Sequence, residues 1–328
     1  MKTGARLALY GLGLVAAFGG AFVIAGAVVP GSVVAGWTEG TEMNGHDEGH
    51  DSGSTASDGA ATTATALKGL ALEIDGFVLS PVQAPATVGA PGELSFQIQD
   101  AAGTPVTEYT TAHDRKLHLI VARSDGSLFR HVHPSLDEAT GTWSLPWEWA
   151  AAGTYRVFAD FTTAGSAAQP LTLTRTVQVA GEFAPVVPQP SQVDQVDGFD
   201  VSIEGDLVAG SPSELTITVA RDGEPLTTLE PYLGAFGHLV ALREGDLAFL
   251  HVHAEGDEPE AGETAGPEIV FAAEAPTAGR YLMYLDFQVD GQVHTAEFVL
   301  DAGHGEGAAH ADANTDADTD TGSHSDGH

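Results

Sequence analysis

The sequence predicts an all-β protein in which two tandem immunoglobulin- or cupredoxin-like β-sandwiches follow one N-terminal transmembrane helix. After the first 35 residues, short apolar and polar alternations rich in Val, Thr, Leu, Phe and Tyr recur, and no long amphipathic helical pattern occurs. Turn signals such as Asp125-Gly126 and Asp222-Gly223 separate these runs. Strands about every 8–12 residues, in units of about 110 residues, are typical of a sandwich.

The N-terminal residues 1–35 are predicted to be a membrane anchor or an uncleaved signal. Lys2 and Arg6 precede an uncharged stretch of 23 residues from Leu7 to Val29, which is long enough to span a bilayer. The basic residues place the N-terminus in the cytoplasm and the bulk of the chain outside. We therefore expect a single-pass protein of the cell membrane; a cleaved signal is the alternative, with the same extracytoplasmic location.

Five further segments are predicted after the anchor. The stalk and the tail are rich in Gly, Ser, Thr, Ala and Asp and lack the apolar residues that a core needs. Their histidines and aspartates can bind metal weakly, and solvated segments without metal are the alternative. The predicted order is a disordered stalk at 36–66, a first sandwich at 67–181, a Pro-rich linker at 182–193, a second sandwich at 194–302 and a disordered His/Asp-rich tail at 303–328.

The two sandwiches are predicted to be copies of one unit. The segment AAGTYRVFADF, from Ala151 to Phe161, matches TAGRYLMYLDF, from Thr277 to Phe287. Upstream, the segment beginning GELSFQIQD at Gly92 matches the one beginning SELTITVAR at Ser213. Matches in two places, in the same order, favour an internal duplication.

Composition excludes several classes of function. The chain carries 12 Lys and Arg against 46 Asp and Glu, a net charge of −34, so a phosphate backbone would be repelled and nucleic acid is not an expected partner. Cations are the expected partners of this field, although the acidity can also serve solubility alone. Because the chain has no cysteine and three methionines, a metal site must use imidazole and carboxylate, which suit Cu(II), Zn(II) or Ni(II).

The pattern His-x12-His-Val-His occurs twice. The first copy gives His118, His131 and His133. If the chain turns at Asp125-Gly126, Ile120 pairs with His131 and His118 with His133, which places all three imidazoles on one face of a hairpin. Such a cluster can supply nitrogen ligands to copper or zinc. Histidine pairs at a wet sheet edge, or histidines bonded to the backbone, are the alternative.

The second copy predicts an equivalent cluster of His238, His251 and His253, with a turn at Gly245-Asp246. The ligands that would complete each site differ between the units. His113 stands where the second unit has Leu233, and His294 belongs to the second unit alone, near the counterpart of Leu173. Asp160 and Asp286 are further candidates, either as ligands or as carboxylates that orient an imidazole.

The stretches from His113 to Pro134 and from Tyr232 to His253 resemble a bacterial family of membrane-anchored or secreted heavy-metal-binding proteins associated with copper handling. The resemblance covers both β units. It implies an extracytoplasmic metal-binding role. Ala254 stands where the first unit has Pro134, which leaves the histidines intact but alters the turn beyond them.

We therefore expect a protein, not an enzyme, that binds, buffers or delivers Cu(II) or Zn(II) outside the membrane, with a membrane metal transporter as a candidate partner. One alternative is a surface interaction module with incidental histidines. Another is a copper–zinc superoxide dismutase-like enzyme, since that fold also has a His-Val-His strand, but its glycine–histidine segments and cysteines are missing here. No Gly-x-Ser-x-Gly or His-Glu-x-x-His motif suggests hydrolysis.

Overall fold

The computed structural model describes residues 67–165, 168–250, 252–260 and 262–305. All of them belong to one compact unit, Thr62–His328. The predicted membrane helix, the stalk and nearly all of the tail lie outside the described residues. Among the residues that are described, no helix is long and apolar enough to cross a membrane.

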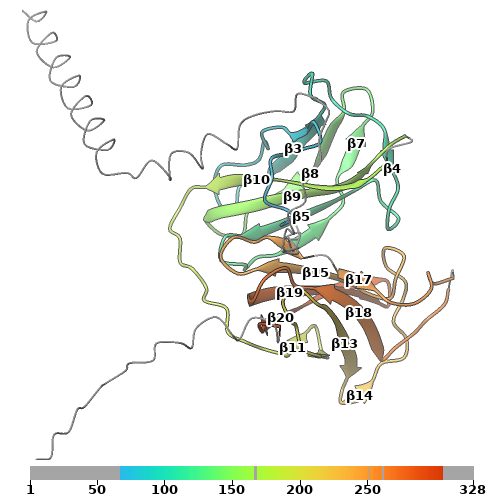
Figure 1. Cartoon of the computed structure of the whole chain (residues 1–328). Coiled ribbons are helices and arrows are strands. Elements are labelled where there is room, and N and C mark those ends of the chain that lie inside the picture. The colour runs from blue at the N-terminus through green and yellow to red at the C-terminus, as the bar shows by residue number, and fades with distance from the viewer. Residues whose placement is uncertain (1–66, 166–167, 251, 261, 306–328) are drawn as a thin grey trace, which may run out of the picture. The chain divides into compact units, whose positions relative to one another are not determined.

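The first half of the described chain forms two antiparallel sheets, in the orders β1-β2-β3-β8-β7 and β10-β9-β5-β6, with β4 paired to β9 (Figure 1). The strands are β1 (Glu73–Ile74), β2 (Phe77–Leu79), β3 (Gly92–Gln99), β4 (Tyr109–Thr110), β5 (Leu117–Arg123), β6 (Arg130–Val132), β7 (Ser135–Asp137), β8 (Thr142–Trp147), β9 (Gly153–Thr163) and β10 (Pro170–Val179).

The second half repeats this arrangement, in the orders β11-β12-β13-β18-β17 and β16-β15-β19-β20, with β14 paired to β13. The strands are β11 (Val193–Val196), β12 (Phe199–Glu204), β13 (Pro212–Arg221), β14 (Glu224–Pro225), β15 (His238–Arg243), β16 (Phe249–Leu250), β17 (Val252–Ala254), β18 (Glu268–Glu274), β19 (Gly279–Val289) and β20 (Gln292–Ala302). The described residues are thus all-β, and the matching strand orders confirm the predicted duplication.

Each half has its own apolar core between its two sheets. In β3, buried and partly exposed residues alternate from Leu94 onward, as expected for a strand with one buried face. Every residue of β5 is buried instead. Leu117, Leu119 and Val121 of β5 point into the first core, so its other face must be covered by something else.

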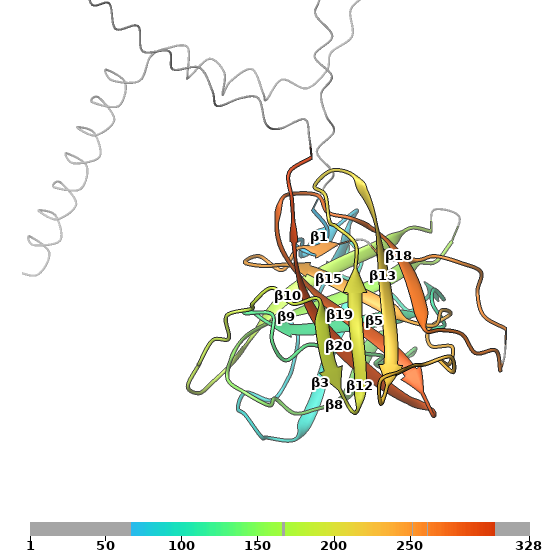
Figure 2. The same ribbon diagram turned by 90° about the horizontal axis from the view of Figure 1, so that it is seen from below.

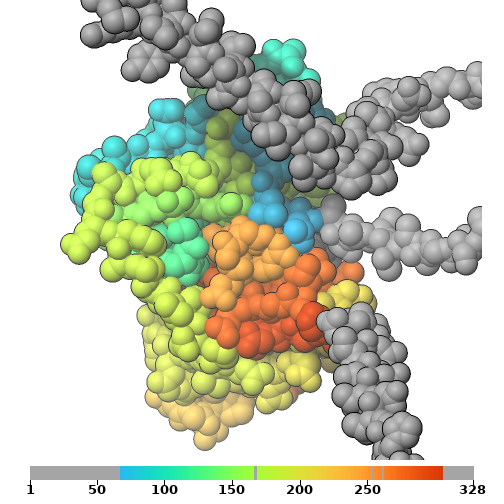
Figure 3. All heavy atoms as spheres, turned by 60° about the vertical axis from the view of Figure 1, so that its left-hand side comes forward, coloured from blue at the N-terminus to red at the C-terminus, as the bar shows by residue number. Residues whose placement is uncertain are grey.

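The second half covers that face. Ile120 and Ala122 of β5 and Phe158 of β9 form a third apolar cluster with residues of β15 and β19, among them Val240 and Leu242. In Figure 1 the strands β5 and β9 lie directly above β15 and β19, and the same strands overlap in the view from below in Figure 2. Figure 3 shows the cyan-to-green surface of the first half meeting the orange surface of the second along a continuous boundary. The two halves therefore dock through equivalent sheets.

A tyrosine near the start of β9, and its counterpart in β19, fastens the chain that precedes each strand. The hydroxyl of Tyr155 donates to the carbonyl of Ala151 at 2.8 Å, and the hydroxyl of Tyr281 donates to that of Thr277 at 2.9 Å. Both side chains are buried, so the phenol oxygen has no free access to water.

We expect Tyr155→Phe and Tyr281→Phe each to lower the free energy of unfolding by about 1 kcal/mol, because each variant removes the part-buried hydrogen bond to the upstream carbonyl while it keeps the ring; Tyr281→Phe also removes a longer contact with Thr277 Oγ1, 3.3 Å away. Urea unfolding of the two variants measures this. Since the two positions are copies, each serves as the control for the other, and a loss at only one of them would contradict the structural equivalence.

Candidate metal centre

Three histidines of the first half converge on one point. His118 lies on β5 and His131 on β6, and His133 follows one residue after the end of β6. The ladder pairs Ile120 with His131, which is the predicted register. His118 Nδ1 lies 3.0 Å from His131 Nε2 and 3.2 Å from His133 Nε2, and one nitrogen of each ring lies within 4.8 Å of the other two. We call these three residues the histidine triad.

Two of the triad rings are held from behind by hydrogen-bond acceptors. His118 Nε2 lies 3.1 Å from the carbonyl oxygen of Ala112, and His131 Nδ1 lies 2.8 Å from Asp286 Oδ2. A carbonyl and a carboxylate accept protons, so each ring must donate its outward N–H to them. The inward nitrogen of His118, Nδ1, therefore presents a lone pair toward His131 Nε2.

Burial keeps two members of the triad, His118 and His133, uncharged at neutral pH. It lowers the pKa of His118 to about 4 and that of His133 to about 3, and the neighbouring imidazoles lower both further. A cation between these rings would bind the lone pair of His118 Nδ1, which lies 3.0 Å from His131 Nε2 and 3.2 Å from His133 Nε2. Four tetrahedral nitrogens at 2.0–2.1 Å from zinc or copper lie about 3.3–3.4 Å apart, a few tenths of an ångström from these spacings.

Asp286 reaches the triad from the second half. It lies on β19, beside His238 on one neighbouring strand and Thr295 on the other. Thr295 donates to Asp286 Oδ1 at 2.6 Å, which leaves Oδ2 for His131. The side chains of His131 and Asp286 are 0% and 4% exposed, so this bond is shielded from water.

Asp160 occupies the equivalent place in the first half. It pairs with His118 across the β5–β9 ladder and accepts a hydrogen bond from Thr172 at 2.7 Å. Burial raises the pKa of its carboxyl. The aligned threonines, Thr172 and Thr295, were not among the residues singled out from the sequence. Their matching places on β10 and β20 of the two repeats are a signal that could have identified them.

The hairpin of the second copy of the motif departs from the predicted pairing. The register of its hairpin is as predicted, with Ala241 paired to Leu250, but the ladder ends there. The chain then crosses to the other sheet, where Val252 and His253 of β17 pair with β18. In the first half the ladder continues to Val132. The predicted cross-strand pair of His238 and His253 is therefore wrong, and His251 lies outside the described residues.

His238 instead joins the histidines of the first half. Its ring centroid lies 4.8 Å from that of His131 and 5.6 Å from that of His118, with which it is stacked. The ring centroid of His113 lies 5.7 Å from that of His238 and 6.1 Å from that of His118. Among the described side chains, five imidazoles from both halves thus lie in one cluster between the docked sheets.

A tight turn presents His113. The amide of Ala112 donates to the carbonyl of Arg115, and both central residues have positive φ, 48° at His113 and 60° at Asp114. These values are typical of a type I′ turn. The second half has the same turn with Leu233 at the place of His113, as the alignment predicted, and Leu233 is buried.

His294 stands apart from the cluster. It pairs with Phe287, and its neighbour Thr295 pairs with Asp286. Since successive side chains on a strand point to opposite faces, His294 faces the interior of its own half while Thr295 faces the docked sheet. His294 packs against Phe199 and bonds to Asp197 at 2.8 Å. A role as the fourth ligand beside His238 does not fit this position, and its structural counterpart is Leu171.

Comparison with known proteins identifies the repeat. A family described as a domain of unknown function, DUF8832, matches residues 73–181 and again residues 194–304. The chain belongs to this family, with two copies of its domain. No curated protein matches the chain.

Several solved structures are distantly similar. They include the adhesin InvE of Yersinia pseudotuberculosis (13% identity, TM-score 0.21, covering 68% of this chain and 58% of that one). A mutant α-2-macroglobulin of Salmonella has 13% identity and a TM-score of 0.23, with 72% of this chain and 15% of that one covered. MtrC of Shewanella baltica has 8% identity and a TM-score of 0.20, with 68% of each chain covered. The chain thus spans about half of the adhesin and a small part of the macroglobulin.

Proposed function

We propose that the protein binds a late first-row transition metal, Cu(II) or Zn(II), at the histidine triad, and that it buffers or delivers this ion outside the cytoplasmic membrane. The observation that carries the proposal is the convergence of three imidazole nitrogens, with two of the rings, His118 and His131, oriented by hydrogen bonds on their far side. Metal-bound histidines almost always donate their second N–H to a carboxylate or a backbone carbonyl. His131 has the first arrangement and His118 the second.

The donor set favours these ions. Imidazole nitrogen suits copper, zinc and nickel, whereas Ca²⁺ and Mg²⁺ require oxygen ligands. The chain has no cysteine, so a thiolate does not compete for the ion. An ion bound by three imidazoles would have its fourth coordination position left for water or for an exchanging ligand. This arrangement suits delivery more than permanent storage.

We also propose that each half is an immunoglobulin-type sandwich, in preference to a cupredoxin-like one. The orders β2-β3-β8-β7 and β10-β9-β5-β6 correspond to the ABED and GFC sheets of that fold. The hydroxyls of Tyr155 and Tyr281, which bond a few residues upstream, correspond to its tyrosine corner. With the N-terminal segment as an anchor, two such domains would hold the metal near a membrane transporter.

Isothermal titration of the full chain with Cu(II) and with Zn(II) tests the proposed function. The triple variant His118→Ala/His131→Ala/His133→Ala is expected to lose one tight equivalent, because it removes the three converging nitrogens. The histidines of the stalk and tail are present in both proteins, so the difference isolates the triad. His304→Ala, which removes one exposed histidine elsewhere, is the matched control. Equal binding by the triple variant and the wild type would contradict the proposal.

A further inference from the structure

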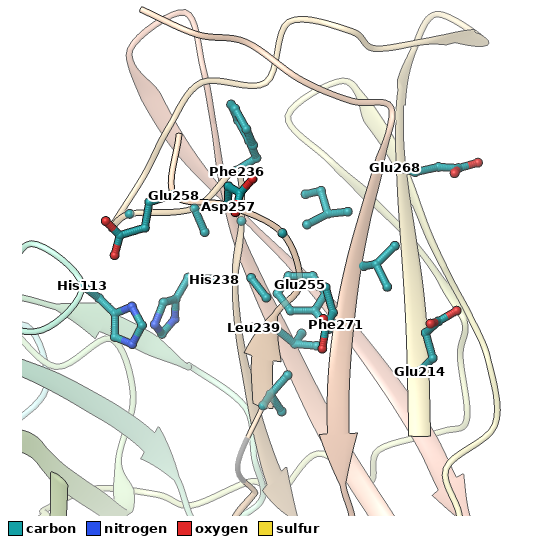
Figure 4. Close-up of a pocket in the computed structure, with 18 residues that line it drawn as sticks. His113, Glu214, Phe236, His238, Leu239, Glu255, Asp257, Glu258, Glu268 and Phe271 are labelled. Atoms are coloured by element: carbon teal, nitrogen blue, oxygen red, sulfur yellow. The ribbon is translucent and has the colours of Figure 1, made fainter. Parts of the chain in front are cut away.

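A cavity of about 640 Å³ opens beside the cluster of five imidazoles. Its walls come from the second half, except for His113 of the first. Figure 4 shows the rings of His113 and His238 next to each other at one end of this cavity. Five carboxylates line the rest of it, and we call it the acidic cavity. These are Glu214, Glu255, Asp257, Glu258 and Glu268.

No positive side chain offsets these carboxylates. The lining contains no Lys or Arg. Within the described part of the chain, none of the five carboxylates forms an ion pair. The basic residues lie on the other side of His113, where Lys68, Arg115 and Lys116 line a second cavity of about 470 Å³. The two openings toward the histidines therefore differ in charge, and cations are drawn to the acidic one.

His238 has an unsatisfied nitrogen at this place. Its Nδ1 is buried and has no hydrogen-bond partner among the described residues. Buried polar atoms without partners are rare in folded proteins, and an unplaced ion is one of their explanations.

His238 is not the missing fourth ligand of the triad. The group of nitrogens that lie within 4.8 Å of one another contains His118, His131 and His133 but not His238. Its nearest histidine on the cavity side is His113, with ring centroids 5.7 Å apart and planes at 80°. This separation resembles the 5.0 Å between the rings of His118 and His133, which are inclined at 83°. His113 and His238 are thus inclined to each other like a pair within the triad, with ring centroids 0.7 Å farther apart.

We propose that His113 and His238 form a second binding position for the same divalent cation, at the inner end of the acidic cavity and next to the triad. This proposal rests on the proposed function of the triad. The two imidazoles supply nitrogen ligands, and Glu258, which lines the same cavity and is labelled in Figure 4, is a candidate oxygen donor. The position binds more weakly than the triad because it has two imidazoles instead of three and opens to solvent.

Titration of the full chain with Cu(II), read by calorimetry and by electron paramagnetic resonance, tests the second position. We expect a weaker equivalent after the triad is filled, together with a half-field resonance from two nearby Cu(II) ions. His113→Gly removes one ligand, and glycine tolerates the positive φ of 48° at that turn. His238→Phe removes the other ligand and keeps a ring stacked on His118. The double variant should lose the weaker equivalent and the half-field signal.

The acidic cavity gives a second, milder test. Glu255→Gln/Asp257→Asn/Glu258→Gln changes exposed side chains only, so the fold is retained, and it should weaken the second equivalent by about tenfold at low ionic strength. The tight equivalent should change much less.

The outcomes separate the two proposals. If the triple-alanine variant of the triad loses one equivalent while the His113→Gly/His238→Phe variant binds as many ions as the wild type, the second position is wrong and the triad stands. If the triad variant loses nothing, the proposed function fails as well. His304→Ala again controls for the loss of one exposed histidine.

Discussion

Asp286→Asn is expected to weaken Cu(II) or Zn(II) binding at the triad by about 10–100-fold, the usual cost of removing an outer carboxylate from a ligating histidine. The effect is notable because none of the three converging nitrogens belongs to the half that carries Asp286. The carboxylate accepts the N–H of His131 at 2.8 Å and so fixes which nitrogen faces the ion. The neutral amide keeps the size of the side chain but loses the charge, so the imidazole is a weaker base and its tautomer is less firmly fixed.

Asp160→Asn is the matched control. Asp160 has the same place in the first half and the same bond from a threonine, 2.7 Å from Thr172. It is the neighbour of His118 across the ladder, but the outward N–H of His118 goes to the carbonyl of Ala112. We expect less than about a threefold change in affinity, since no ring orientation depends on it. If Asp160→Asn weakened binding more than Asp286→Asn, the triad would be oriented from within its own half, and the structure would be wrong on this point.

The sequence allowed the hairpin to be predicted but not its surroundings. Turn residues and strand alternation were enough to pair Ile120 with His131 and to place three imidazoles on one face. They do not say what that face meets. The run Leu117–Arg123 is nearly continuous in apolar residues, which is typical of strands buried on both faces. In the structure its second face docks on the other repeat.

The position of His238 could not be predicted for the same reason. The sequence pattern within one repeat places His238 in a site of its own, whereas docking brings its ring within 4.8 Å of His131. The sequence likewise did not predict that the second hairpin crosses to the other sheet at an earlier position. It depends on the pairing of Val252 with Ala273 of β18, two residues that are far apart in the sequence.

The docked interface itself depends on Tyr284. Its ring is stacked on Phe129 at 3.9 Å, its hydroxyl donates to the carbonyl of Gly126, and it is 2% exposed. Gly126 fits tightly here, because a Cβ at that position would lie 2.1 Å from a methyl of Leu282. One aromatic residue of the second half therefore contacts the turn of the hairpin that carries the triad and the residue that precedes its second strand, β6.

Tyr284→Ala is expected to lower the stability of the docked state by about 3–5 kcal/mol, the usual cost of truncating a buried aromatic residue. Each half keeps its own core, so calorimetry should show the single unfolding transition of the wild type separating into two. Metal affinity should fall in the same variant although no ligand is changed, because Asp286 lies two residues from Tyr284 on β19 and retreats from His131 when the halves separate.

Metal should reverse part of this effect. An ion at about 100 times its dissociation constant stabilises the state that binds it by about 2.7 kcal/mol, so saturating Zn(II) should bring the two transitions of Tyr284→Ala back together. Tyr281→Phe is the control, because it removes a hydrogen bond inside the second half without touching the interface, and it should lower stability while leaving metal affinity unchanged. A Tyr284→Ala protein that unfolds in one transition and binds metal like the wild type would show that docking and the metal centre are independent. The orientation of His131 from the opposite half argues that they are coupled.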